Sequence, residues 1–70
     1  MSIVKVLEVM ANSTKSWEDA AQNAVNHASK TIHNIRSLWV QDQSAVVNEN
    51  KITEYRVTMK LSFEIDMIEK

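Results

Sequence analysis

Hydrophobic and polar residues alternate with a period of two over three stretches of the chain, as is typical of half-buried β-strands. These stretches are residues 2–10, 37–47 and 52–66. The last is the most regular, with Val57, Met59 and Leu61 on one side and Thr58 and Lys60 on the other. Asn48–Lys51 separates the second stretch from the third, and its two Asn residues tolerate the left-handed backbone of a tight turn. The pattern predicts one strand, an intervening segment and then a hairpin.

The intervening segment has apolar residues at spacings of three and four, which predicts an amphipathic helix. Ser16 and Asp19 have the spacing of a capping box, so we expect the helix to begin there. Asn34 is the best substitute for a C-terminal Gly in a chain that contains no Gly, and we expect the helix to end near it. The buried face is rich in Ala, whose small side chain lets a sheet approach the helix axis closely.

A strand, a helix and a hairpin predict an α+β fold of β-α-β-β order, in which a three-stranded antiparallel sheet wraps on one helix with the last strand in the middle. Pairing Val47 with Ile52 sets a register that places Gln43 opposite Arg56. Asp42 falls on the side of its strand that should be apolar, as does Ser44, which indicates either a β-bulge or an exposed strand edge.

The chain has 70 residues and no Cys, and we interpret residues 1–70 as one domain. A domain this small buries only about 60% of its unfolded surface, so without disulfides we expect neighbouring copies to complete the core. A net charge of −1 argues against a nucleic-acid partner. The N-terminal apolar run is interpreted as a strand and not as a signal peptide, so we expect a cytoplasmic protein that has no membrane partner.

Catalytic motifs are not apparent, and we expect no enzyme activity. His27 and His33 are six residues apart, which does not place them on one helix face as a metal-binding pair. Glu64, Asp66 and Glu69 offer carboxylates that could gather a calcium ion between copies, although a solvated charged end is the simpler interpretation.

Trp39 lies on the predicted sheet face that does not pack on the helix. It has two interpretations: a contact between subunits, or a platform on which a flat aromatic ligand stacks. In the predicted register Gln43 and Arg56 share this face and would supply hydrogen bonds to ring carbonyls or to a phosphate.

The sequence resembles the dodecin family along nearly its whole length. The resemblance is carried by VKVLEVMANSTKSWEDAAQNAV, NIRSLWVQDQSAVV and KITEYRVTMKLSFEID, which occur in order and without gaps. It implies a β-α-β-β subunit that assembles as a hollow homododecamer, binds flavin (riboflavin or FMN) between symmetry-related Trp residues, and stores the flavin without catalysis.

Two positions depart from the flavin-binding pattern of that family. The stacking Trp of the flavin binders aligns with Ser37, and the Gln that contacts the ring aligns with Arg56, whereas the acidic residue near the pocket is matched by Asp42. Trp39 is on the same strand face as Ser37. The segments SWEDAA, NIRS and KITEYR are similar to a second branch that lacks the Trp and includes a calcium-binding member. The resemblance therefore leaves flavin and calcium as candidate ligands, and a purely structural dodecameric shell as the remaining alternative.

Overall fold

The computed structural model describes residues 2–66 and has the predicted order of elements. Strand β1 (Ser2–Ser13) is followed by helix α1 (Trp17–Ala28) and by the hairpin of β2 (Ile35–Asn48) and β3 (Lys51–Asp66). The sheet order is β1-β3-β2, and β3 pairs antiparallel with both neighbours. The α+β fold class and the central position of the last strand are therefore confirmed.

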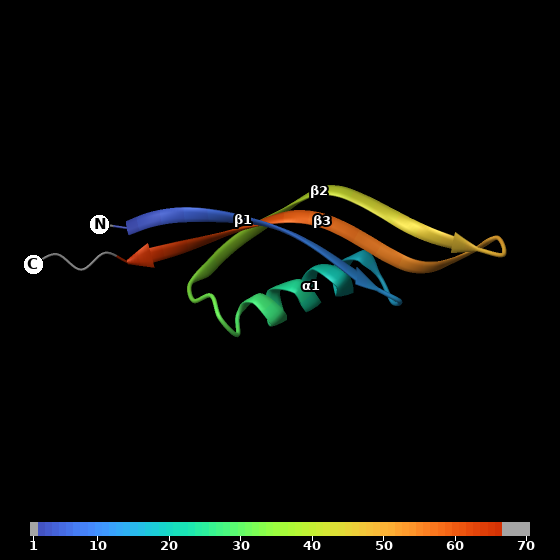
Figure 1. Cartoon of the computed structure of the whole chain (residues 1–70), viewed down its shortest axis with the longest axis horizontal. Helices are drawn as coiled ribbons and strands as arrows, with labels where there is room; N and C mark the ends of the chain where they lie inside the picture. The colour runs from blue at the N-terminus through green and yellow to red at the C-terminus, as the bar shows by residue number, and fades with distance from the viewer. Residues whose placement is uncertain (1, 67–70) are drawn as a thin grey trace, which may run out of the picture.

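Helix α1 lies across one face of the sheet (Figure 1). The core beneath it is formed by Ala20 of the helix together with Val57 and Met59 of β3, which are at most 2% exposed. Leu61, next along the same side of β3, is fully buried as well. The small Ala20 side chain permits this close approach, as the Ala-rich helix face predicts. No helix within residues 2–66 is long and apolar enough to cross a membrane.

The start of the helix agrees with its predicted cap. The Ser16 hydroxyl accepts a hydrogen bond from the Asp19 backbone N–H at 2.9 Å. Trp17 ties this end to the hairpin, because its indole Nε1–H donates to the Ser44 carbonyl at 2.9 Å and its ring packs edge-on against Tyr55 with centroids 4.8 Å apart. The helix terminus is thereby anchored to both β2 and β3.

The predicted end of the helix is wrong, because α1 ends at Ala28 and not near Asn34. Its C-cap is Ser29, and the backbone N–H groups of Thr31 and Ile32 both donate to the Ala28 carbonyl, at 3.1 and 2.9 Å, in the turn that follows the helix. Asn34 does adopt the left-handed conformation expected of it, with φ 65°, but it does so at the entry to β2. Ser and Thr in this segment compete for backbone hydrogen bonds and favour the turn over continued helix.

The strands are longer than predicted at several ends, and the β2–β3 hairpin extends beyond the helix (Figure 1). At its tip Glu49 and Asn50 have positive φ angles of 52° and 66°, so Asn50 takes a left-handed position as expected while Asn48 remains in β2. The pair Val47 and Ile52 is confirmed, and both side chains are at least half exposed because no helix underlies the tip.

The register of the hairpin follows the prediction only at its two ends. Leu38 pairs with Leu61 and Val40 with Met59 as expected, but the register shifts by one residue after Val40 and shifts back before Val47. The bulge suggested by the polar Asp42 is thereby confirmed. The predicted pairing of Gln43 with Arg56 is wrong, because Gln43 lies opposite Val57.

Candidate functional site

The sheet face turned away from α1, called here the outer face, carries most of the predicted site residues. Residues directly opposite each other on neighbouring strands point to the same side of a sheet, so the two registers define rows of side chains across this face. In the order β1, β3, β2, the rows are Val6–Ser62–Ser37, Glu8–Lys60–Trp39, Met10–Thr58–Asp42 and Asn12–Arg56–Ser44. Ser37, Trp39, Asp42 and Arg56 thus occupy one surface in four consecutive rows.

The bulge at Gln41 decides which residues reach this surface. Without it, Asp42 and Ser44 would face the helix and Gln43 would face outward. With the extra residue, Asp42 lies opposite Thr58 on the outer face, while Gln43 lies opposite Val57 on the helix side. The expectation that Gln43 shares a face with Trp39 and Arg56 is therefore corrected.

Trp39 is an exposed aromatic side chain on an otherwise mixed surface. It is 45% exposed and lies opposite Lys60. Its neighbour on the same strand face, Ser37, shares a hydrogen bond with Ser62 across an Oγ–Oγ distance of 2.6 Å. The position that carries the Trp of flavin binders in the resemblance is thus a satisfied Ser pair, and Trp39 stands one row away.

Arg56 is held by a short network that crosses two strands. Its Nε–H donates to Oε1 of Glu54 at 3.2 Å, and the Asn12 side-chain amide donates to Oε2 of the same carboxylate at 3.0 Å. Among the described residues no hydrogen bond is recorded to the Nη atoms of Arg56, whose side chain is 51% exposed. A hollow of about 370 Å³ adjoins it, lined by Met10, Ala11, Asn12 and Arg56.

The carboxylates predicted to gather calcium near the C-terminus are only partly covered by the structure. Glu64 forms an ion pair with Arg36 at 3.0 Å. The Asp66 side chain and Glu69 lie outside the described residues. Within the described part of the chain, no group of three or more His, Asp or Glu side chains gathers to hold a metal ion. The expected calcium site combines carboxylates of neighbouring copies, so it stays a prediction.

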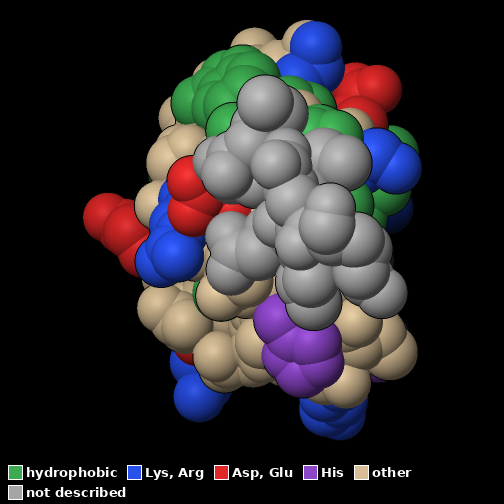
Figure 2. All heavy atoms as spheres, turned by 90° about the vertical axis from the view of Figure 1, so that its left-hand side faces the viewer, with side chains coloured by type: hydrophobic (Ala, Val, Ile, Leu, Met, Phe, Trp, Pro, Cys, Tyr) green, Lys and Arg blue, Asp and Glu red, His purple; other side chains and the backbone are tan. Residues whose placement is uncertain are grey.

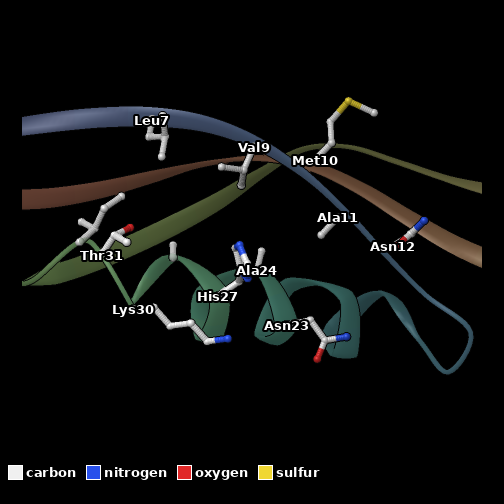
Figure 3. A pocket seen from close by; sticks show the side chains of 12 residues that line it. Leu7, Val9, Met10, Ala11, Asn12, Asn23, Ala24, His27, Lys30 and Thr31 are labelled. Carbon is white, nitrogen blue, oxygen red and sulfur yellow. The ribbon is translucent and has the colours of Figure 1, made fainter.

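A second hollow separates β1 from α1 (Figure 3). It is an open groove of about 610 Å³, with Leu7 and Val9 pointing toward the helix and Ala24 and His27 on the helix opposite. Met10 points the other way, toward the outer face, as strand alternation requires (Figure 3). None of the predicted site residues lines this groove, and the only hint of it in the sequence is the Ala-rich helix face.

Hydrophobic side chains remain exposed on the sheet side of the molecule. Seen along the long axis, they gather above the strands, on the side away from the helix (Figure 2). Those on the outer face include Val4, Val6, Met10 and Trp39, with Met10 74% exposed. An exposed apolar surface of this kind is typical of an interface or a ligand site.

Comparison with known proteins identifies the family. The dodecin family model matches residues 3–66. Calcium dodecin of Mycobacterium tuberculosis is 39% identical over 66 residues, which cover 93% of this chain and 92% of that protein. Its crystal structure, described as that of a calcium-chelating immunodominant antigen with a novel calcium-binding site, has a TM-score of 0.78 at 32% identity and 97% coverage of both chains. A dodecin from Streptomyces davaonensis has a TM-score of 0.87 at 29% identity, covering 94% of this chain and 97% of that one. With the same element order, the same sheet and a family match over nearly its full length, this chain belongs to the dodecin family.

Proposed function

We propose that copies of this chain assemble into a closed homo-oligomer, a dodecamer by family resemblance, which binds and stores a flavin at contacts between copies. The single observation that carries the ligand proposal is the exposed Trp39 on the outer face, with Asp42 and Arg56 on the same surface. The proposed role is binding and not catalysis.

The need for assembly follows from the small core. The buried hydrophobic side chains among residues 3–65 are Ala20, Val57, Met59 and Leu61. The Cα trace of the subunit spans 61 × 20 × 12 Å, and a trace this thin encloses little interior. Neighbouring copies that cover the outer face would bury the apolar side chains exposed there, and they would place Trp39 at or near a contact.

A flavin suits this surface because its ring system is flat, with hydrogen-bonding groups along one edge. Offset stacking of such a ring on Trp39 contributes about 0.5–1.5 kcal/mol beyond the area that it buries. The Asp42 carboxylate accepts from a ring N–H, and Arg56 donates to a ring carbonyl or a phosphate. Because Ser37 stands where the stacking Trp of flavin binders aligns, the stack in this chain would be displaced toward Trp39.

Titration of the purified oligomer into riboflavin or FMN tests the proposal. We expect saturable quenching of flavin fluorescence at micromolar protein, since stacking on an indole ring quenches the flavin. The Trp39→Ala variant should bind about tenfold more weakly or worse while its solution mass stays unchanged. Trp39→Phe is the matched control, because it keeps an aromatic face and should retain part of the affinity.

Two results would contradict the flavin proposal. Unchanged emission with the wild-type oligomer would remove flavin as the ligand. Dissociation of the Trp39→Ala variant into subunits would instead assign Trp39 to packing between copies.

Calcium binding is the second candidate, favoured by the 39% identity to a protein named calcium dodecin. Glu8 and Asp42 place carboxylates on the outer face, where neighbouring copies could combine them into the oxygen-rich shell that calcium prefers. We expect calcium, but not an equal concentration of magnesium, to raise the melting temperature of the oligomer, as measured by calorimetry after chelator treatment. Equal melting temperatures with and without calcium would exclude this candidate.

A further inference from the structure

We infer that Arg56 makes the outer-face site selective for ligands that join a flat aromatic ring to a phosphate monoester, such as FMN, over the unphosphorylated ring. The inference rests on the proposed flavin site and names the class of ligand that the site prefers. It begins from the side chain that replaces the ring-contacting Gln in the resemblance.

The geometry of Arg56 is that of a fixed anion receptor. Glu54 accepts from Nε through one carboxylate oxygen and is itself held by Asn12 through the other. Engagement of Nε orients the guanidinium plane and leaves the Nη edge available, since no partner for it is recorded among the described residues. Two parallel N–H groups of a guanidinium match two oxygens of a phosphate, which gives a bidentate contact.

The spacing between Arg56 and the aromatic platform fits a ligand with two separated parts. Arg56 is four residues from Lys60, the residue opposite Trp39, so at about 3.4 Å per residue the two rows lie roughly 14 Å apart. A phosphate at the end of the sugar-alcohol chain of FMN projects away from the ring in this manner. The hollow of about 370 Å³ beside Arg56 offers room for it.

The intervening charges favour the same arrangement. Asp42 lies in the row between Trp39 and Arg56, where it repels a phosphate but accepts a ring N–H. Lys60, the residue opposite Trp39, lies between Trp39 and Glu8, so this row carries no net charge and suits a neutral ring. The phosphate is assigned to Arg56 by its available Nη edge and not by the net charge of that end, because Glu54 accompanies Arg56.

The test compares the affinities of FMN and riboflavin in the wild type and in Arg56→Gln, by fluorescence titration of the intact oligomer. We expect the substitution to weaken FMN about tenfold and to change riboflavin by less than about twofold, because only FMN loses a charge-assisted contact. Arg56→Lys should give an intermediate FMN affinity, since Lys keeps the positive charge but lacks the two parallel N–H donors of the guanidinium. Inorganic phosphate should compete with FMN and not with riboflavin, and the preference should decline with added salt.

Arg36→Gln is the matched control, because Arg36 also pairs with a Glu, at 3.0 Å, but at the other end of the sheet. An equal loss of FMN affinity in this control would overturn the inference, since it would show a nonspecific effect of net charge. An unchanged FMN-to-riboflavin ratio in Arg56→Gln would overturn the inference and leave the flavin site standing. Failure of both flavins to bind the wild type would instead refute the proposed function, and the inference with it.

Discussion

At the scale of single residues, the turn of the hairpin shows how a Gly-free chain meets a conformational demand. A two-residue hairpin turn of type I′ requires left-handed backbone at both central positions, which residues other than Gly, Asn and Asp adopt at a cost. Asn50 adopts this conformation at little cost, whereas Glu49 adopts it, at φ 52°, with a steric penalty. The turn therefore stores strain at one identifiable residue.

Replacing Glu49 with Gly should stabilise the protein by about 0.5–1 kcal/mol, because relief of the left-handed strain exceeds the extra entropy of the unfolded chain. The measurement is the denaturation midpoint at fixed protein concentration. Asn48→Gly is the control one position earlier, in β2 and outside the positive-φ positions, where added flexibility should lower stability by a similar amount. Equal destabilisation by both substitutions would show that the Glu49 backbone carries no strain.

The same scale explains why Gln43 was placed on the wrong face. Its type and its position in the alternation suit an outward orientation, and the sequence signals the bulge only through the polar residues on either side of Gln43, Asp42 and Ser44. Its orientation depends on whether one extra residue, Gln41, is accommodated in β2. Ser37, Trp39 and Arg56 lie outside the shifted part of β2 or on the regular β3, so their outer-face positions were predicted correctly.

At the scale of elements, the β2–β3 hairpin contains three register shifts, of which the two near its middle compensate each other. The register shifts near Gln41 and returns near Thr53, so residues 37–40 and 47–48 keep the simple pairing while residues 42–46 are offset by one residue. The third shift lies between Ile35 and Ser37. The offset puts the polar Asp42 and Ser44 outward and thereby spares the helix-facing side two unsatisfied polar groups. The polar residues at apolar positions were the visible signal of this bulge.

Helix α1 differs from the hairpin, because the sequence marks the start of the helix clearly and its end hardly at all. Ser16 and Asp19 identify its start, and the observed hydrogen bond at 2.9 Å agrees with that prediction. Its end carries no Gly, and the apolar spacing continues through Ile32 after the helix has stopped at Ala28. Ile32 is half-buried although it lies in the segment that connects α1 to β2. The apolar periodicity therefore continues past the end of the helix and predicts a helix that is too long.

At the scale of the whole molecule, the subunit is a thin sheet with a single short helix on one face. The helix packs on β1 and β3 and leaves Leu38 and Val40 of β2 partly exposed on the same side as the helix. Both sheet faces therefore present apolar side chains to whatever surrounds the subunit. We therefore expect the chain to fold only as copies of it associate.

Dilution should then unfold the protein. We expect the melting temperature to fall as protein concentration decreases from micromolar to nanomolar, because association stabilises only the folded chain by mass action. Circular dichroism combined with sedimentation would follow secondary structure and mass together. A folded single-chain species that persists at nanomolar concentration, with an unchanged melting temperature, would contradict the proposed assembly.

The sequence alone determined the order of elements, the antiparallel sheet with β3 at its centre, the helix start and the outward position of Trp39. The elements and the helix start follow from local periodicity or from a cap, which are properties of neighbouring residues, and the central place of β3 follows from the rules for connecting a strand, a helix and a hairpin. The tertiary structure alone decided the end of the helix, the orientation of Gln43, and the network of Asn12, Glu54 and Arg56. These depend on which distant residues face each other, and in a β-sheet a shift of one residue in that pairing reverses every side chain beyond it.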